Sequence, residues 1–494
     1  MKYLPTGEEM KYADRFTIDT IGLPSMVLME RAAMCVVDAV ERESMDVSKP
    51  LILCGAGNNG GDGYAVARLL KLKGHDVEIL CLGKESSRSA ENRKQMEIAS
   101  YYNIPMHTEL PNKKYSMVID ALFGTGLTRD VTGAYANVLE AVNAMSCCKL
   151  AVDVPSGVND TTGKIMGTAF RADYTVAIAF VKRGLVFYPA QEYAGKVIVG
   201  DIGIMPDALK QDAMMTYHYE WDDLCKRYPK RSANSHKGSH GKVLLIVGSK
   251  GMSGASYLSA RAAYEVGAGL VQIYTDEANR EILQKLLPEA IITTYTTYDE
   301  TVLHRLLTWA DVIGIGSGLG TSELAVCLVK QTLQQASVPC IVDADAINIL
   351  AQHQDWMNCR SELVLTPHMK EMSRLTGYTV KELQESRIEL LNELTAKYPL
   401  VCVLKDARTL VSKRGENLYV NVSGNAAMAK AGSGDVLMGM IAGITAQRMN
   451  GYDSACLGVY LHGLAGDAAR DEKGSYSVLA DDIIDGISCV LKKI

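Results

Sequence analysis

The feature that most constrains the fold is a set of short, almost wholly apolar segments that alternate with helical patterns in both halves of the chain. From residue 50 to about 204 the segments read LILCGAG, DVEILCLG, YSMVIDALFG, KLAVDVPSG, DYTVAIAF and GKVIVGDIG. The second half repeats the pattern with KVLLIVGSKG, LVQIYT, DVIGIGSGLG, PCIVDADAIN, LVLTPH and LVCVLKD. Runs of valine, isoleucine and leucine separated by helices are typical of a parallel sheet covered on both faces. The chain is therefore predicted to be α/β, with two domains.

A polar stretch, YHYEWDDLCKRYPKRSANSHKGSHG, separates the two halves and has the charge, proline and glycine typical of a linker. The 494 residues also exceed one ordinary core, since domains usually have ~100 to 200 residues. We place the boundary near residues 212–230 and predict domains at 1–215 and 225–494. Before the first strand, the sequence reads as two helices divided at Gly22 and Pro24.

Charge and composition narrow the range of partners. The chain is 48% hydrophobic and 22% charged with a formal net charge of -6, so it has no positive field to collect nucleic acid or anionic membrane. Its N-terminus lacks the apolar core of a signal peptide, and no apolar stretch approaches the ~20 residues of a membrane span. The twelve cysteines include no C-x-x-C pair, which disfavours a disulfide framework or zinc site. We expect a soluble, cytoplasmic protein with no nucleic-acid or membrane partner.

A glycine-rich loop follows the first predicted strand. Residues 54–64, CGAGNNGGDGY, satisfy the pattern G-x-G-x-x-G between a strand and a helix, where backbone N–H groups and the helix dipole favour a pyrophosphate. However, the acid that a coenzyme-binding domain places after its second strand is absent, because EILCLG ends in Leu82 and Gly83. A coenzyme role is therefore disfavoured. The loop also carries polar side chains that coenzyme loops usually lack, namely Asn58, Asn59 and Asp62.

Three further loops at the predicted carboxyl ends of strands carry polar groups. Asp120 precedes FGTGLTRD, Asp153 precedes VPSG, and Lys182 follows AIAFV. Ligands of open parallel sheets bind at this edge. The glycines of residues 124–130, GTGLTRD, form a second candidate loop for an anion. The first half therefore predicts a ligand cleft at the carboxyl edge of its sheet.

The blocks LMERAA, CGAGNNGGDG, VIDALFGTGL and AVDVPSG, in this order, resemble the NAD(P)H-hydrate epimerase domain over roughly residues 1–215. The resemblance implies a Rossmann-like, three-layer domain that binds a cofactor whose nicotinamide ring is hydrated at C6 and interconverts its R and S epimers. It also implies a potassium ion held by oxygen ligands from Asn59, Asp120 and Ser156. The implied substrate contacts are Asn58, Asn59, Gly60, Gly61, Asp62, Gly124, Thr125, Gly126, Leu127, Thr128, Arg129, Asp130 and Asp153.

Epimerisation at a carbon that bears a hydroxyl needs acid and base help as the hydroxyl leaves and returns, or as the ring opens and closes. Asp153 is the predicted proton-transfer residue, Asp62 is expected to position phosphate or ribose, and Lys182 is a weaker candidate. The alternative for Asp153 is a capping or turn carboxylate before Pro155.

In the second half, AKAGSGDVLMGMIAG places Gly432, Ser433 and Gly434 directly before a helix with apolar residues at helical spacing. A glycine turn at a helix N-terminus forms an anion hole for a transferring phosphoryl group, and the adjacent Asp435 is placed to take a proton from an attacking hydroxyl. The alternative, a helix N-cap aspartate after a glycine loop, is a good account of Asp435 alone.

Residues 235 to about 490 resemble the NAD(P)H-hydrate dehydratase domain of the ribokinase-like superfamily, through SHKGSHGKVLLIVGS, GASYLSARAAYEVGAGLV, GIGSGLG, VDADAIN, LTPHMKEMSRLTG and GSGDVLMG. The resemblance implies that a nucleotide phosphorylates the C6 hydroxyl of the hydrate and that phosphate then leaves. Magnesium is expected to bridge the nucleotide phosphates. Asp435 matches the catalytic base and also a hydrate contact, and Gly434 matches a nucleotide contact. The other implied hydrate contacts are Ala255, Gly318 and His368.

The two domains in this order resemble the bacterial bifunctional repair enzymes, which use ADP. The nucleotide loop LKDART departs from the usual Lys-Gly pattern, because Asp406 stands in the glycine position and would repel a diphosphate unless it turns outward or binds metal. The nucleotide contacts expected from this loop are Lys405, Asp406, Ala407, Arg408 and Thr409. Two alternatives stay open: a ribokinase-like small-molecule kinase with a regulatory first half, and a noncatalytic scaffold. Such folds also often form homo-oligomers, which we expect here.

Overall fold

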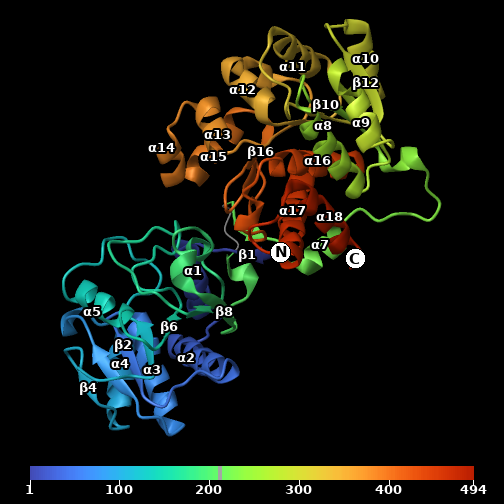
Figure 1. The fold of residues 1–494 in the computed structure, drawn as a ribbon. Helices are drawn as coiled ribbons and strands as arrows, with labels where there is room; N and C mark the ends of the chain where they lie inside the picture. The colour runs from blue at the N-terminus through green and yellow to red at the C-terminus, as the bar shows by residue number, and fades with distance from the viewer. Residues whose placement is uncertain (210–213) are drawn as a thin grey trace. The chain divides into compact units, whose positions relative to one another are not determined.

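The computed structural model describes residues 1–209 and 214–494 (Figure 1). The chain divides into two compact units, one formed by Tyr3–Thr216 and the other by Tyr217–Ile494 together with Met1–Lys2. The predicted boundary at 212–230 begins at residues 212 and 213, which lie outside the described residues.

The described part of the first unit contains a seven-stranded sheet in the order β4-β3-β2-β5-β6-β7-β8. Every adjacent pair in this sheet is parallel. The predicted α/β class with a parallel sheet is therefore confirmed. The strands are β2 (Pro50–Cys54), β3 (Glu78–Cys81), β4 (Met106–His107), β5 (Met117–Ala121), β6 (Cys148–Val152), β7 (Tyr174–Ile178) and β8 (Lys196–Gly200).

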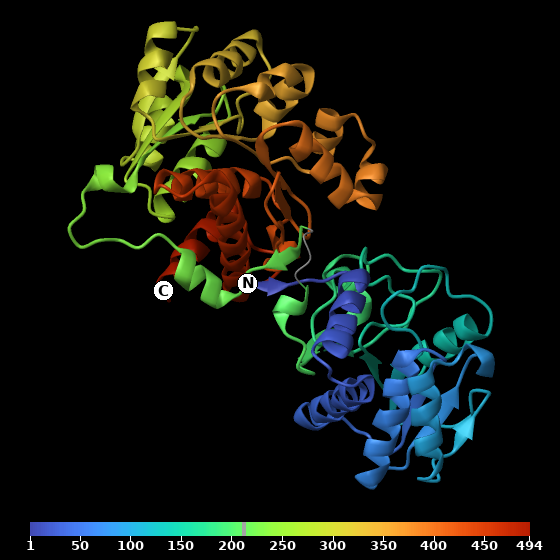
Figure 2. The same cartoon turned by 180° about the vertical axis from the view of Figure 1, so that it is seen from behind.

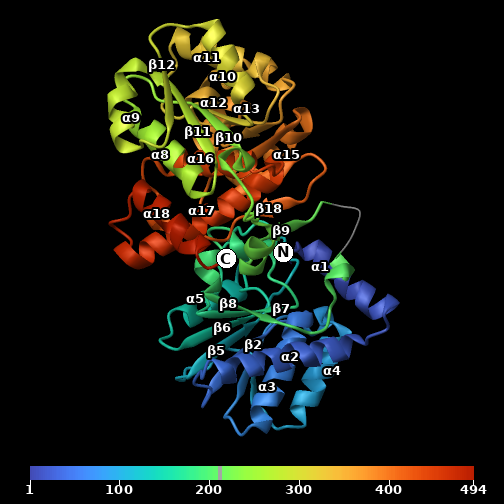
Figure 3. The same cartoon turned by 90° about the vertical axis from the view of Figure 1, so that its right-hand side faces the viewer.

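Helices cover both faces of this sheet, and successive residues of β2 show why. Leu51 and Leu53 belong to one apolar core, whereas Ile52 and Cys54 belong to the other, as the two-residue period of a strand requires. The second of these cores includes side chains of α2, α3 and α4, and Figure 3 shows these helices beside the sheet. Helix α5 packs into the first core. The helices are α1 (Gly7–Arg15), α2 (Ser25–Arg42), α3 (Asn58–Leu72), α4 (Ala90–Ser100), α5 (Ala134–Asn143) and α6 (Gln191–Ala194), with the short turns η1 (Phe16–Thr20), η2 (Glu85–Ser87), η3 (Arg183–Val186) and η4 (Pro206–Leu209).

The two helices predicted before the first strand are also confirmed. Helix α1 begins with a capping box, in which Thr6 Oγ1 accepts a hydrogen bond from Glu9 N and Glu9 accepts one from Thr6 N. A π-helical turn extends α1 to Thr20, and the chain then turns at Gly22, whose φ of +85° suits glycine. Helix α2 starts at Ser25, directly after Pro24.

The second unit is built on a sheet with the order β1-β9-β18-β17-β16-β15-β14-β13-β10-β11-β12, which has eleven strands among the described residues. Pairing is parallel from β12 to β16, and β16, β17 and β18 are antiparallel. The strands are β1 (Lys2–Tyr3), β9 (Thr216–His218), β10 (Lys242–Ile246), β11 (Leu270–Asp276), β12 (Ile291–Tyr295), β13 (Val312–Ile315), β14 (Cys340–Val342), β15 (Leu363–Leu365), β16 (Leu400–Leu404), β17 (Leu410–Lys413) and β18 (Leu418–Val420).

Helix α16 lies at the centre of the second unit, where it packs against α8, α17 and strand β13. All its residues from Val436 to Ala446 are buried. Figure 2 shows α16 and α17 in red within this unit. The helices are α7 (Trp221–Arg227), α8 (Ser253–Glu265), α9 (Arg280–Leu286), α10 (Glu300–Trp309), α11 (Glu323–Gln335), α12 (Ala344–Gln352), α13 (Met369–Thr376), α14 (Val380–Glu385), α15 (Arg387–Lys397), α16 (Ser433–Ala446), α17 (Gly451–Lys473) and α18 (Ala480–Leu491), with the short turns η5 (Lys237–His240), η6 (Glu277–Asn279), η7 (Gln354–Asn358) and η8 (Ala426–Met428).

Within residues 1–209 and 214–494, no helix has both the length and the apolar character needed to cross a lipid bilayer.

Candidate active sites

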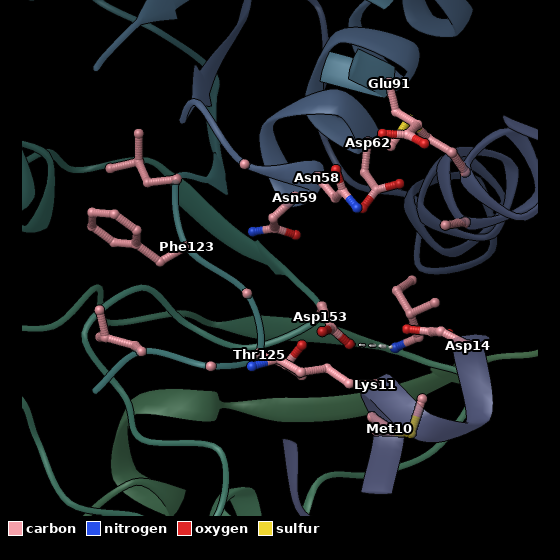
Figure 4. Close-up of a pocket in the computed structure, with 18 of the residues that line it drawn as sticks. Met10, Lys11, Asp14, Asn58, Asn59, Asp62, Glu91, Phe123, Thr125 and Asp153 are labelled. Carbon is pink, nitrogen blue, oxygen red and sulfur yellow. Dashed lines mark hydrogen bonds between the residues drawn. The ribbon is translucent and has the colours of Figure 1, made fainter. Parts of the chain in front are cut away.

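The first unit contains a cavity of about 760 Å³ at the carboxyl edge of its sheet, a volume typical of small-molecule sites. Helices α1 and α2 close the cavity from the other side (Figure 4). Many of the residues predicted to bind substrate line it: Asn58, Asn59, Asp62, Gly124, Thr125, Gly126, Leu127, Thr128, Arg129 and Asp153. Gly60, Gly61 and Asp130 lie outside this lining, so their substrate contacts remain predictions.

The glycine-rich loop is held in place by a buried side-chain network. Asn92 Nδ2 donates hydrogen bonds to Gly55 O at 2.9 Å and to Gly57 O at 2.7 Å. Arg88 in turn donates to Asn92 Oδ1 at 2.9 Å. A Cβ atom on Gly60 would lie 2.0 Å from Gly55 O, so the loop can close only with glycine there. The loop therefore enters α3 in a fixed conformation, and the sequence did not reveal that Asn92 and Arg88 fix it.

Asp153 and Lys182 form an ion pair at the carboxyl ends of β6 and β7. Lys182 is 1% exposed, and its Nζ donates to Asp153 Oδ1 and, at 2.6 Å, to Ile178 O. Asp153 Oδ1 also accepts a hydrogen bond from Ile178 N at 3.1 Å. The backbone of Asp153 has a φ of +70°, which is uncommon for a residue other than glycine and typical of a functional constraint. Asp153 is thus both a loop-organising carboxylate and a cavity-lining one.

Two more carboxyl groups share this cavity. Burial, followed by the charges of Asp153 and Asp14, raises the pKa of Asp62 well above its usual range. Burial also raises the pKa of Asp14 to about 6, although Lys182 lowers it. Figure 4 shows these groups entering from different elements: Asp62 from α3, Asp153 after β6, and Asp14 from α1. The cavity therefore combines proton-holding carboxyl groups with an ion pair, which equips it for acid–base chemistry.

Two of the residues matched to the potassium ion, Asp120 and Ser156, are hydrogen-bonded to each other, and the third, Asn59, lines the cavity. Asp120 is fully buried: its Oδ1 accepts from Ser156 Oγ at 2.7 Å and its Oδ2 accepts from Ser156 N at 2.7 Å. Ser156 Oγ accepts from Phe123 N at 2.9 Å, and the next residue, Gly124, packs against Asn59. Both polar atoms of the Asn59 amide are buried without a hydrogen-bond partner. A buried amide oxygen without a partner and a buried carboxylate are both hard oxygen donors, so the chemistry of these residues fits potassium.

In the second unit, Gly432 and α16 form the predicted anion-binding turn. Gly432 has a φ of +91°, which lets the chain enter α16 sharply. Beneath the turn, Ser433 Oγ lies 3.3 Å from Nε2 of His462 on α17. Burial lowers the pKa of His462 to about 4, so this ring is neutral at physiological pH. His462 therefore adds no positive charge next to the first turn of α16, where the N–H groups carry the positive end of the helix dipole.

A carboxylate beside this turn ties together the ends of four adjacent strands. Asp343, after β14, accepts hydrogen bonds from Lys405 Nζ at 2.7 Å, Thr366 Oγ1 at 2.6 Å and Ser317 Oγ at 3.3 Å. These partners follow β16, β15 and β13 respectively. A Cβ atom on Gly434 would lie 3.4 Å from Lys405 Nζ, so this cluster directly adjoins the turn. Sequence reasoning did not assign a role to Asp343, although VDADAIN contained it.

Asp435 lies in the first turn of α16. Burial, followed by the charge of Asp343, raises the pKa of Asp435 to about 6, while Ser317 and Lys405 lower it. A carboxylate with this pKa is largely ionised near neutral pH, as a general base requires. The N-cap position of α16 is occupied by Gly432, and Asp435 lies three residues further along the helix. The explanation of Asp435 as an N-cap is therefore wrong.

The other predicted residues of this unit have mixed surroundings. A Cβ atom on Gly318, whose φ is +61°, would lie 2.9 Å from the Ala255 Cβ, so these two predicted hydrate contacts adjoin each other. The imidazole of His368 instead caps α13, accepting from Lys370 N at 3.1 Å and Glu371 N at 3.3 Å. This capping role explains His368 without a ligand, and its hydrate contact remains a prediction.

Asp406 is partnered by a cation that the sequence did not reveal. Arg387 Nη1 lies 3.3 Å from Asp406 Oδ2, and Asp406 Oδ1 accepts from Ala407 N at 2.8 Å. Thr409 Oγ1 donates to the Asp406 carbonyl oxygen at 3.2 Å, and Arg408 is buried. Arg387 therefore offsets part of the negative charge of Asp406, whose side chain is 35% exposed, and the effect of Asp406 on nucleotide binding remains a prediction.

An acid-lined cavity at the edge of a parallel sheet, together with a glycine turn at a helix N-terminus beside a mixed sheet, is typical of an α/β enzyme. Residues 25–184 match the family described as YjeF-related protein N-terminus, and residues 243–488 match NAD(P)H-hydrate dehydratase. A bifunctional NAD(P)H-hydrate repair enzyme from Moorella thermoacetica is 36% identical over 519 residues, covering 100% of this chain and 97% of that protein. The enzyme of the same name from Escherichia coli is 33% identical and covers 97% of this chain and 92% of that protein.

Among solved structures, a ribokinase-like superfamily protein from Enterococcus faecalis V583 is 32% identical, covers 56% of this chain and 96% of that chain, and has a TM-score of 0.51. The chain belongs to the family of bifunctional NAD(P)H-hydrate repair enzymes. The enzyme class and the family predicted from the sequence are thereby confirmed, as is the ribokinase-like fold of the second half.

Proposed function

We propose that residues 1–215 epimerise the R and S forms of NAD(P)H hydrate, and that residues 225–494 dehydrate the S form to NAD(P)H with ADP, releasing AMP and phosphate. The observation that carries this proposal is the division of chemistry between the sites. The cavity of the first unit holds the carboxyl groups of Asp62 and Asp153 beside Lys182, whereas the second site places the carboxylate of Asp435 in the first turn of a helix that begins with a glycine turn.

In the first unit, the loops of residues 57–59 and 124–129 would bind the diphosphate and ribose through backbone N–H groups, aided by the charges of Lys11 and Arg129. The nicotinamide ring would then face Asp62, Asp153 and Lys182. Asp153 moves a proton to or from the oxygen on C6, and Lys182 holds Asp153 in place. Helices α1 and α2 exclude bulk water from the ring.

Asn59, Asp120 and Ser156 would hold the potassium ion, which supplies a fixed positive charge next to the loop that begins at Gly124. Occupying this site would satisfy the Asn59 amide oxygen and balance the buried carboxylate of Asp120.

In the second unit, Asp435 accepts the proton of the C6 hydroxyl as that oxygen attacks the terminal phosphorus of ADP. The N–H groups of residues 432–434 stabilise the charge on the transferring phosphoryl group. Phosphate then leaves C6 easily, because the lone pair of the ring nitrogen forms a nitrogen–carbon double bond as the C6–O bond breaks. Loss of a proton from C5 to water then forms the C5–C6 double bond and restores the reduced nicotinamide. Lys405, fixed by Asp343, contributes positive charge beside Gly434.

The loop 405–409 and Gly434 are proposed as nucleotide contacts, and Ala255, Gly318 and His368 as hydrate contacts. A magnesium ion would neutralise charge on the nucleotide phosphates, and the hard oxygens of Asp345 and Asp435 are the side-chain candidates to hold it. These donors fit a cation, because Asp343 and Asp345 both raise the pKa of Asp435 through repulsion that a cation would relieve. We also propose that the enzyme works as a homo-oligomer.

Joining the two activities is chemically useful, because only one epimer suits the second site and continual epimerisation lets the whole hydrate pool react. The test incubates the purified chain with the epimer mixture and either ADP or ATP, and follows the absorbance of reduced nicotinamide. The proposal predicts full recovery of NAD(P)H with ADP, with AMP and phosphate formed in equal amounts. A stable phosphorylated hydrate, or no recovery, would show that the second site is instead a kinase or inactive.

A further inference from the structure

Asp14 is a cavity residue for which the proposed epimerisation so far has no use. It lies in the last turn of α1, and its side chain lines the cavity beside those of Met10 and Lys11 (Figure 4). Its neighbour Ala13 is fully buried, so the helix packs against the unit through one face while Asp14 borders the ligand space. Helix α1 thereby brings an acid to the cavity from outside the sheet.

No hydrogen bond among the described residues explains the position of the Asp14 carboxyl group. Among the residues that the structure describes, no hydrogen bond or ion pair to this carboxyl group is found. The N-terminus of α1 is already capped by Thr6 and Glu9, and Asp14 lies at the C-terminal end, where the helix dipole disfavours a carboxylate. A partly buried, unpartnered carboxyl group is costly for folding, so a role toward a ligand is favoured.

Asp14 and the Asp153–Lys182 pair act on the same space from different elements. The charges of both Lys182 and Asp153 reach the Asp14 carboxyl group strongly enough to affect its ionisation. Asp153 follows β6 at the sheet edge, whereas Asp14 comes from the helix that closes the cavity. A ring bound in the cavity would lie between helix α1, which carries Asp14, and the sheet edge, which carries Asp153.

We propose that Asp14 is a second catalytic residue of the epimerase site, which acts on one face of the hydrated ring while Asp153 acts on the other. This inference rests on the proposed epimerase function of the first unit. It assigns to α1 a chemical role beyond closing the cavity.

In one direction of the reaction, the protonated Asp14 gives its proton to the C6 hydroxyl oxygen. The C6–O bond breaks, and the lone pair of the ring nitrogen forms a nitrogen–carbon double bond. A water molecule then attacks C6 on the opposite face, the double-bond electrons return to nitrogen, and Asp153 takes the released proton. Water and Lys182, which contacts Asp153, return the proton to Asp14. The reverse reaction uses the same groups with their roles exchanged.

The test uses the full chain with hydrate enriched in the R epimer, without nucleotide, and follows appearance of the S epimer by chromatography. Asp14→Asn should slow epimerisation by about a hundredfold, the scale of one lost acid–base group. Asp14→Glu, which keeps the acid, should retain an intermediate rate. The matched control is Asp19→Asn, which removes an exposed acid from the adjacent π-helical turn outside the cavity lining and should change nothing.

A pH profile separates proton transfer from simple positioning. Because Asp14 must start protonated, the epimerisation rate of the unmodified chain should fall as pH rises above about 6, and Asp14→Asn should lose this decline while Asp14→Glu keeps it. The comparison between variants holds the other charged groups of the cavity constant. They are Lys11, Asp62, Glu91, Arg129, Asp153 and Lys182.

The possible failures are distinguishable. If the unmodified chain does not epimerise the hydrate, the proposed function of the first unit is wrong. If it does, and Asp14→Asn is as fast as Asp19→Asn or keeps the same pH decline, the role of Asp14 is wrong. Dehydration of the S epimer with ADP should be equal in all variants, because that site belongs to the other unit. Hydrogen exchange of β6 and β7 that matches the unmodified chain verifies that the first unit of each variant has folded.

Discussion

Each of the two proposed sites lies at the carboxyl ends of parallel strands in its own sheet. The sites differ in how many hydrogen-bond partners their polar side chains have. In the second unit, Asp343 is saturated by Lys405, Thr366 and Ser317, so the charges next to the anion-binding turn are fixed before a ligand arrives. In the cavity of the first unit, Asp14 has no hydrogen-bond partner among the described residues, and the Asn59 amide is also unpartnered.

The difference matches the chemistry proposed for each site. Stabilising a phosphoryl group during its transfer requires hydrogen-bond donors and positive charges that are already in position, because reorganising them during the reaction costs free energy. Inverting a carbon by moving a hydroxyl requires groups whose protonation changes, and these must remain free to exchange protons. The partnered cluster around Asp343 therefore suits the transfer of a phosphoryl group beside the base Asp435, and the titratable acids of the cavity suit proton transfer.

The largest expected effect comes from removing the base of the second site. Asp435→Asn should reduce ADP-dependent dehydration of the S epimer by roughly a thousandfold, within the range for a lost general base. Epimerisation should stay unchanged, because the residue belongs to the other unit. Glu472→Gln, at an exposed acid on α17, is the matched control. Equal loss of both activities in Asp435→Asn would contradict the proposal that the two reactions take place at separate sites.

Next in size is the effect of breaking the ion pair of the cavity. Asp153→Asn should lower epimerisation by about a hundredfold and destabilise the first unit by about 3 kcal/mol, because Lys182 is left buried and uncompensated. Hydrogen exchange of β6 and β7, followed by mass spectrometry, measures the stability. Replacing Lys182 by Met in the same chain should restore most of the stability without the activity. Restored activity in that double variant would show that Asp153 only organises the loop.

Dehydration should also depend on pH through Asp435. The pKa of this carboxyl group is about 6, and a general base must be ionised, so the rate at saturating ADP should rise with pH through about 6 and then level off. A rate that falls over this range would contradict the role of Asp435 as a base. Measuring epimerisation on the same samples sharpens the comparison, because the role proposed for Asp14 predicts the opposite slope.

The potassium site predicts a smaller effect that is confined to the first unit. Replacing potassium by a bulky organic cation should slow epimerisation. Asn59→Leu should raise the potassium concentration needed for half-maximal epimerisation by about tenfold, because it removes one group of the metal site. Dehydration measured on the S epimer is the internal control. A potassium response that Asn59→Leu leaves intact would place the ion elsewhere.

The smallest effect is expected at the nucleotide loop. Asp406 is 35% exposed and already paired with Arg387, so Asp406→Gly should change the KM for ADP less than about fivefold, in line with the weak energies of such pairs. An improvement of tenfold or more would mean that the carboxylate does repel the diphosphate despite Arg387.

Local sequence signals predicted most of the fold. The apolar runs identified the parallel strands, because valine, isoleucine and leucine fill a sheet buried on both faces, and Gly22 and Pro24 correctly divided the first two helices. The antiparallel strands β17 and β18 were not predicted, since the short segments LVSK and LYV carry no clear period.

The site was predicted only where the residues lie in recognisable loops. The loop residues from Asn58 to Asp62 and the turn around Asp435 follow strands or begin helices, so local pattern places them at a ligand edge. Asp14 and Asn92 reach the site from helices, and Arg387 lies 19 residues from its partner Asp406. No local pattern encodes such contacts, because packing between distant segments creates them.

The most direct test of two separate sites is complementation between two inactive variants. Asp62→Ala should lack epimerisation but dehydrate the S epimer, and Asp435→Asn should do the reverse. Each variant alone, given the R epimer and ADP, should form little NAD(P)H, whereas an equal mixture should recover a rate near that of the unmodified chain. If the mixture is no faster than the variants alone, or if Asp62→Ala also loses dehydration of the S epimer, the separation of the two activities is wrong.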